Sequence, residues 1–193
     1  MYARIQTIAS RPDNADKLAR ELVEIISGHP GYAGLVLLES ALLTLWTTRQ
    51  DAEFASQRSQ AGRGPRPVTL LTDDSYEVEE DQPGPAAHRP ATDGWIGFFD
   101  GPLRPDRLAA IRRAGAEQIG PALRAVPGLV RTLTMWDPGT AKFAVAHLTD
   151  SPGSLREVGE TITSTRPLTG DAPAAVSGPD RIATDRVVAY EPV

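Results

Sequence analysis

The chain carries the same Pro-Gly motif once in each half. His29-Pro30-Gly31-Tyr32 stands in the first half and Val126-Pro127-Gly128-Leu129 in the second. Each motif follows a stretch with helical spacing of apolar residues and precedes two apolar runs. Repetition at this scale constrains the fold more than any single residue, because it implies that one supersecondary unit is used twice.

The order of elements around the two motifs defines that unit. A helix is expected before each motif, through Asp16-Lys17-Leu18-Ala19 in the first half and Asp106-Arg107-Leu108-Ala109 in the second. Further helical stretches are expected near 51–60 and 154–163. The expected strands are 2–9, 35–38, 42–48, 72–78, 129–136, 142–148 and 184–190. The sequence therefore predicts a β-α-β-β-α-β unit written twice.

The composition predicts where the two halves meet. The segment Gln82 to Pro90 is rich in proline and poor in apolar residues, so we expect it to lie outside any core. We predict a first repeat over 1–80, a Pro/Gly-rich linker over 81–93 and a second repeat over 94–193. Each half is long enough to bury a core of its own.

Charge and composition exclude several classes of function. The formal net charge is -5, so the chain lacks the basic surface that nucleic acids and anionic membranes require. No apolar run is long enough for a transmembrane helix, and we expect a soluble cytoplasmic protein. The absence of cysteine excludes disulfides, thiolate nucleophiles and cysteine-ligated metal sites.

Two local signals make sharper predictions. Pro121 lacks an amide proton, so we expect the helix before the second motif to break near Gly120. Asp137-Pro138-Gly139-Thr140 predicts a hairpin turn between two strands, because proline and glycine favour the dihedral angles of such turns.

Two stretches of the first half carry a family resemblance. Gly31 to Leu38 and Leu42 to Phe54 resemble the second strand of the antibiotic biosynthesis monooxygenase (ABM) superfamily and its third strand running into an acidic helix start. Members of that family pair two chains into a dimeric α+β barrel. The resemblance therefore implies an α+β fold in which two ferredoxin-like β-α-β-β-α-β repeats pack as an intramolecular barrel. A tethered pair of this kind predicts a monomeric pseudo-dimer.

The resemblance also implies an activity. Some members of the superfamily oxidise aromatic polyketides without metal or flavin, in an apolar cavity with a few polar groups. A hydrophobic small molecule is then the expected partner, and no cofactor is expected. For any one aromatic residue, simple core packing is the stronger interpretation. The candidate pocket residues are Gln6, Tyr32, Trp46, Phe54, Tyr76, Trp95, Phe98, Met135, Trp136, His147 and Tyr190.

Two polar candidates stand within strands. Gln6 lies mid-strand and is able to orient a substrate carbonyl, or it points outward or bonds a neighbouring strand. His147 follows an apolar run and is a candidate proton acceptor, although a lone strand histidine is more often structural. The histidines, at 29, 88 and 147, share no metal-binding spacing. The sequence identifies no catalytic residue.

Haem degradation, another activity of the superfamily, is not supported by the residues. Its pattern resembles an asparagine on the first strand, a tryptophan on the second helix and a haem-ligating histidine shortly after. Gln6 and Gln57 stand at or near the first two places, and no histidine lies between Phe54 and Val68. Two hypotheses therefore remain: a cofactor-independent monooxygenase-like protein acting on an aromatic small molecule, or a non-catalytic binding or interaction module.

Overall fold

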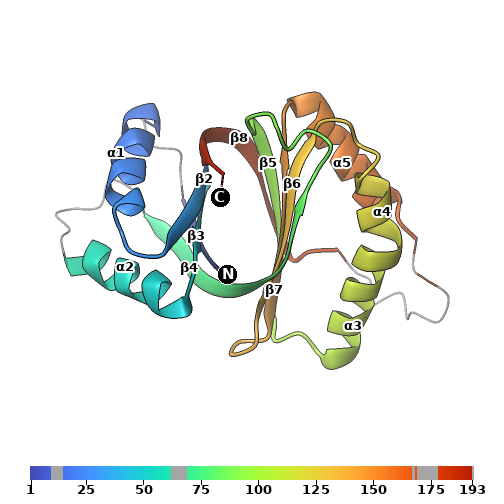
Figure 1. Ribbon diagram of the computed structural model, residues 1–193. Coiled ribbons are helices and arrows are strands. Elements are labelled where there is room, and N and C mark those ends of the chain that lie inside the picture. The colour runs from blue at the N-terminus through green and yellow to red at the C-terminus, as the bar shows by residue number, and fades with distance from the viewer. Residues whose placement is uncertain (10–14, 62–68, 167, 169–177, 193) are drawn as a thin grey trace. The chain divides into compact units, whose positions relative to one another are not determined.

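The computed structural model describes residues 1–9, 15–61, 69–166, 168 and 178–192. In the first half these form β1 (Tyr2–Ile8), α1 (Ala15–Ser27), β2 (Tyr32–Leu38), β3 (Ala41–Trp46), α2 (Arg49–Ala61) and β4 (Leu70–Pro83) (Figure 1). The second half begins with β5 (Asp93–Phe99) and α3 (Pro105–Ala114), then a π-helical segment (Gly115–Ile119) and α4 (Gly120–Leu123). It ends with β6 (Leu129–Asp137), β7 (Lys142–Thr149), α5 (Pro152–Ser164) and β8 (Arg181–Glu191).

The strands do not form two separate ferredoxin-like sheets, so the predicted fold class is wrong. They are hydrogen-bonded in one closed order, β1-β3-β2-β8-β5-β7-β6-β4. The decisive strand is β8, whose residues 187–191 pair antiparallel with β2 of the first half. The edge of β2 would expose unpaired backbone groups in an isolated repeat, and β8 satisfies them instead. In this order β8 lies between β2 and β5, so the last strand does not end a separate sheet of the second half.

Close contacts divide the chain into two units. Unit 1 comprises Met1–Val78 with Asp185–Val193, and unit 2 comprises Glu79–Thr184. Strand β4 runs without interruption to Pro83, and Ala86 and Ala91 are buried, although the composition there suggested a segment outside any core. The division into 1–80, 81–93 and 94–193 stays a prediction.

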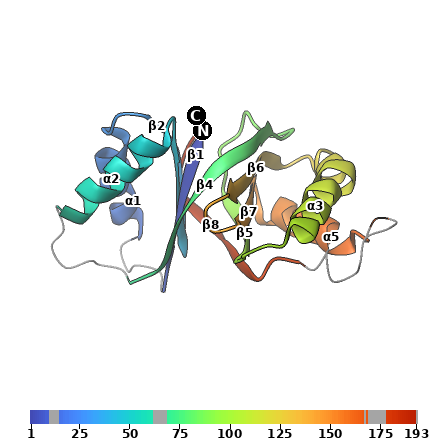
Figure 2. The ribbon, with the colours of Figure 1, turned by 90° about the horizontal axis from the view of Figure 1, so that it is seen from below.

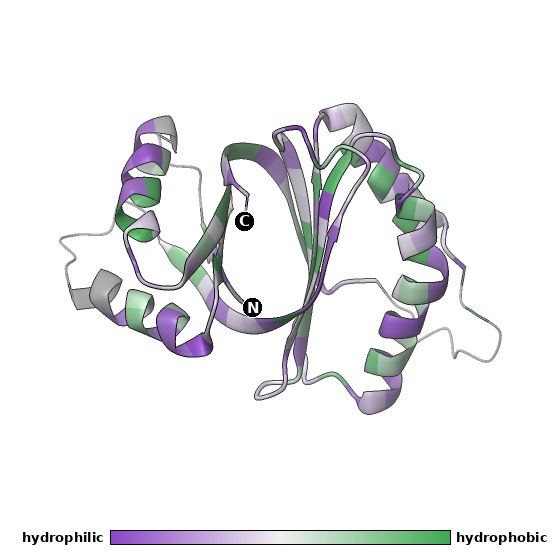
Figure 3. Ribbon diagram, in the orientation of Figure 1, coloured by the Kyte–Doolittle hydropathy of each residue, from purple (hydrophilic) through white to green (hydrophobic). Residues whose placement is uncertain are grey.

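In unit 1, helices α1 and α2 cover one face of the strands (Figure 2). Ala19 of α1 packs with Leu35 and Leu37 of β2, while Trp46 of β3 packs with Ala52 of α2. Strand alternation places these residues on the helix-covered face, because successive side chains point to opposite sides of a sheet. Much of α2 outside these contacts is hydrophilic (Figure 3).

In unit 2, two apolar clusters connect the strands to their helices. Phe99, Leu103 and Phe143 pack against residues of α3, and Leu129 packs with Val158 of α5. The helix before the second motif is interrupted by the π-helical segment Gly115–Ile119, which ends directly before Gly120, where a break was expected. The Gly120 N–H bonds to the Gly115 carbonyl there, a wider spacing that tolerates a proline in the next turn.

The two Pro-Gly motifs have a shared physical basis. A Cβ at Gly31 would collide with the Asp51 side chain in the first turn of α2, and one at Gly128 would collide with Ser154 in the first turn of α5. Gly31 also has φ of 72°, which favours glycine. The repeated glycine thus lets a helix start approach the turn closely. The predicted hairpin turn is confirmed, with the Asp137 carboxylate accepting the Gly139 N–H at 2.9 Å.

Candidate functional site

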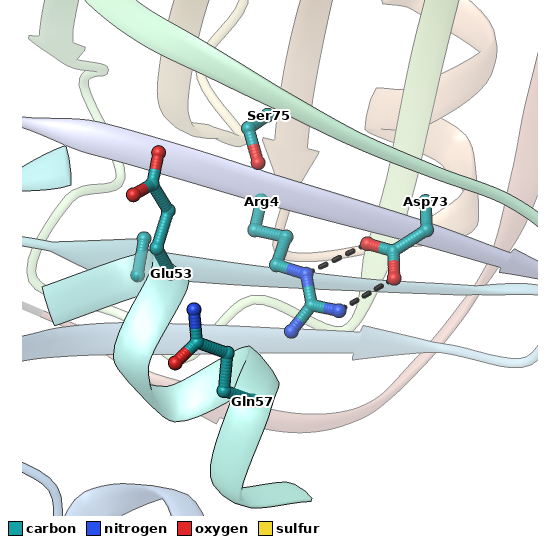
Figure 4. A pocket seen from close by; sticks show the side chains of 6 residues that line it. Arg4, Glu53, Gln57, Asp73 and Ser75 are labelled. Atoms are coloured by element: carbon teal, nitrogen blue, oxygen red, sulfur yellow. Dashed lines mark hydrogen bonds and ion pairs between the residues drawn. The ribbon is translucent and has the colours of Figure 1, made fainter. Parts of the chain in front are cut away.

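A hollow of about 280 Å³ lies between α2 and strands β1 and β4 of unit 1 (Figure 4). Strand register brings its polar residues together: Arg4 lies opposite Ser75, and Gln6 lies opposite Asp73. Alternation along β1 puts Arg4 and Gln6 on the same face as Tyr2, which packs toward α2. The hollow is lined by Arg4, Ala52, Glu53, Gln57, Asp73 and Ser75.

The Arg4 side chain forms a two-pronged ion pair with Asp73. Arg4 Nε donates to Oδ1 at 2.7 Å, and Nη2 donates to Oδ2 at 2.5 Å. Gln6 Nε2 donates to the same Oδ2 at 3.0 Å. The Arg4 side chain is only 10% exposed and that of Asp73 is 33% exposed. Such a fork fixes the plane of the guanidinium as well as its position.

The third guanidinium nitrogen of Arg4 is the one left for a ligand. Among the residues that the structure describes, no hydrogen bond uses Nη1. Figure 4 shows Nη1 on the side of the guanidinium toward Gln57 of α2. Glu53, one turn earlier on the helix, accepts from Arg49 Nε at 3.1 Å in an exposed pair. The hollow therefore presents a fixed donor, an amide and a carboxylate to whatever enters it.

The residues that line this hollow include none of the candidate residues of unit 1. Tyr32 and Trp46 meet edge to face at 6.0 Å, and Trp46 Nε1 donates to Thr44 Oγ1 at 2.9 Å. Phe54 of α2 is 46% exposed. Tyr76 is buried on the opposite face of β4 from Ser75. That these residues and Gln6 form the wall of a ligand cavity stays a prediction.

Another polar contact in unit 1 involves the first motif. Tyr32 Oη donates to Glu191 Oε2 at 2.5 Å, and burial together with that carboxylate raises the pKa of Tyr32. Tyr190, another candidate, is half-buried and pairs with Val36. The Tyr32 hydroxyl is therefore a structural donor, with its proton held near neutral pH.

The candidates of unit 2 do not gather at one site. The rings of Trp95 and His147 are 5.4 Å apart, and His147 Nδ1 lies 3.1 Å from Thr132 Oγ1. Burial lowers the pKa of His147 to about 4, because the charged imidazolium loses its hydration there. Trp136 lies under the Arg112 guanidinium at 5.5 Å. Phe98 and Met135, both buried, belong to the core.

The residues that line the hollow escaped the sequence reasoning. Arg4 and Asp73 are separated by 69 positions, so their pairing follows only from the β1–β4 register. One signal was present: Arg4 and Gln6 alternate with apolar residues in β1. Polar side chains at strand spacing on a buried strand indicate a polar surface that needs partners.

The hollow does not fit haem. No histidine lines the hollow, and His29 contacts Trp46 edge to face at 6.4 Å. His147 is 3% exposed, with Trp95 and Thr132 against its ring, which leaves it no free approach to an iron atom. The described part of the chain contains no group of three side chains placed to hold a metal ion. Within the same part, every helix is too short or too polar to cross a membrane.

Comparisons with known proteins find solved structures with a similar fold but no relative by sequence. No family model matches the chain, and no curated protein matches it in sequence. A provisionally named monooxygenase from Fusobacterium nucleatum subsp. nucleatum superposes with a TM-score of 0.65 at 12% identity, over 99% of this chain and 93% of that one. A chlorite dismutase variant from Candidatus Nitrospira defluvii gives 0.61 at 11% identity, over 96% and 90%.

A heme-degrading enzyme from Listeria monocytogenes gives a TM-score of 0.50 at 12% identity, over 98% of this chain and 99% of that one. The chain shares the fold of these proteins. The resemblance to the monooxygenase-like α+β fold is therefore confirmed for the fold, whereas the arrangement as two tandem repeats is not.

Proposed function

We propose that this chain is a monooxygenase-like protein that binds an aromatic small molecule in the hollow of unit 1 and oxidises it with O₂ without a cofactor. The observation that carries the proposal is the fixed Arg4 guanidinium, which has two nitrogens bound to Asp73 and a third beside the hollow. The shared fold with a protein named as a monooxygenase supports the reaction class. Fold alone does not carry activity, so the site has to supply the chemistry.

The residues suit a substrate that becomes an enolate. Arg4 would donate a hydrogen bond to the substrate oxygen on which negative charge develops, an interaction that grows stronger in the transition state. Glu53, the lining carboxylate that is not paired with Arg4, would accept the proton. In the oxidation of anthrone, the methylene carbon loses two hydrogens, which leave with one oxygen atom as water. The second oxygen atom becomes the new carbonyl of anthraquinone, and anthrone supplies all the electrons.

Oxygen uptake with anthrone tests this proposal. We expect O₂ consumption above the rate of anthrone alone, with one anthraquinone formed per O₂. Arg4→Met and Glu53→Gln should each lower the rate by about a hundredfold, the usual effect of losing one charge-stabilising or proton-accepting group. Gln50→Ala, an exposed change on the same helix outside the hollow, is the matched control. No uptake above background, or equal uptake in all four proteins, would contradict the proposal.

The second candidate is a non-catalytic binding module. It is favoured by one observation: all three charged groups on the hollow's walls are already in ion pairs, Arg4 with Asp73 and Glu53 with Arg49. Saturable binding of anthrone under nitrogen, without O₂ uptake in air, would identify the chain as a binder. A saturable Soret shift with added haem that His147→Ala abolishes would instead show that haem binds after all.

A further inference from the structure

We infer that Asp73 determines the class of ligand that the hollow accepts, selecting an uncharged hydrogen-bond acceptor over an anion. This deepens the proposed function and rests on it for the aromatic part of the ligand. Asp73 would not contact the ligand directly. It would act through Arg4, by holding the guanidinium in position and by offsetting its charge. The argument rests on the charges, the burial and the hydrogen bonds around Arg4.

The charges at the hollow are balanced before any ligand arrives. Arg4 is the one cation among the lining residues, and its charge is compensated by Asp73. Glu53 is the other lining carboxylate, and its partner Arg49 lies outside the lining. A carboxylate ligand would approach two carboxylates and a guanidinium that is already paired. It would lose hydration without gaining a net attraction.

An uncharged carbonyl meets none of these costs. Its oxygen needs one donor, and Arg4 Nη1 supplies it without disturbing the two bonds to Asp73. Gln57 and Ser75 on the opposite walls offer further hydrogen bonds to a hydroxyl or a second carbonyl. The site thus binds a carbonyl with a full cationic donor while presenting no net positive charge to anions.

Gln6 keeps Asp73 in this arrangement. It is 8% exposed and donates to Asp73 Oδ2, the same oxygen that Arg4 Nη2 bonds. Because Gln6 lies opposite Asp73 in the β1–β4 register, the backbone fixes this contact. The carboxylate is therefore held between two donors and cannot rotate away to make room for an anionic ligand.

A pair of ligands that share one ring system tests the inference. 2-Acetonaphthone carries an uncharged methyl ketone where 2-naphthoate carries a carboxylate, and binding of each is measured by calorimetry under nitrogen. We expect the native protein to prefer the ketone. Asp73→Asn should raise the affinity for naphthoate by about tenfold, the order of one charge interaction near a partly exposed surface. The same change should alter ketone affinity by less than about twofold, because Nη1 is retained.

The chain offers a closely matched control. Asp81, on the same strand, accepts hydrogen bonds from Nε and Nη2 of Arg131 at 2.7 Å each. The exposures match as well, 9% for Arg131 and 32% for Asp81, but neither residue lines the hollow. Asp81→Asn should therefore leave both affinities unchanged. Equal gains of naphthoate affinity in the two variants would show a general charge effect and overturn the inference.

Further outcomes would also overturn it. These are tight naphthoate binding by the native protein, an unchanged ligand ratio in Asp73→Asn, or no binding of either ligand.

If Asp73→Asn fails to fold by circular dichroism, Glu53→Gln on the exposed face of α2 removes the other negative charge and should raise naphthoate affinity by about threefold. Ligand preference without O₂ uptake would sink the proposed oxidation alone. Arg4-dependent uptake with no ligand preference would sink this inference alone.

Discussion

The helix-covered faces of the two units differ in kind. In unit 1 the face carries one buried indole, Trp46, beside the Arg4–Asp73 ion pair and an open hollow. In unit 2 it carries Trp95 against the buried imidazole of His147. The first face therefore has groups that can bind a polar ligand, whereas the second face mainly packs the unit together. Three experiments challenge that division.

The largest expected effect is on stability, from truncating the indole of each face. Trp46 is 2% exposed and packs with Ala52 and Ala55, so Trp46→Ala should lower the free energy of unfolding by about 3–5 kcal/mol. Trp95 is half-buried, and Trp95→Ala should cost roughly half as much. Urea denaturation followed by far-ultraviolet circular dichroism measures both. A larger cost for Trp95 would mean that the packing of the second face had been underestimated.

The next effect depends on pH and belongs to unit 2. His147 has a pKa of about 4 when folded against an ordinary value of 6.5, so the unfolded chain binds its proton first as pH falls. Stability from this group is complete above pH 6.5, falls between pH 6.5 and about 4, and then levels off. At about 1.4 kcal/mol per pH unit the full loss is about 3 kcal/mol.

His147→Gln should remove this pH dependence, because glutamine keeps a hydrogen-bonding group near Thr132 but does not titrate. His88→Gln, at an exposed position, is the control and should keep the slope of the native protein. The measurement is the free energy of unfolding in urea at a series of pH values. An unchanged slope in His147→Gln would show that the imidazole reaches water.

The sequence could predict local structure better than strand pairing. The Pro-Gly motifs located two helix ends and the strands that follow them, because proline and glycine redirect the chain locally. The sequence could not predict that β8 pairs with β2, because the alternation of side chains along a strand does not determine which strand lies beside it. The hollow was missed for the same reason: Gln6 was recognised as unusual, whereas Asp73 and Glu53 come from distant elements. His147 was recognised, but only tertiary burial gives its pKa.

The smallest expected effect on stability comes from breaking either of the two-pronged ion pairs of β4, Arg4–Asp73 and Arg131–Asp81. Arg4→Met and Arg131→Met each leave a carboxylate unpaired, but those carboxylates are 33% and 32% exposed and keep part of their hydration. We therefore expect each change to cost about 1–2 kcal/mol in urea denaturation, below the 3–5 kcal/mol typical of fully buried pairs. Because the two ion pairs are equally exposed, we expect the two variants to lose the same free energy of unfolding within error. Ketone binding should disappear only in Arg4→Met, because Arg131 does not line the hollow. If Arg131→Met also abolished binding, destabilisation would explain both results, and the difference between the two faces would lose its functional meaning.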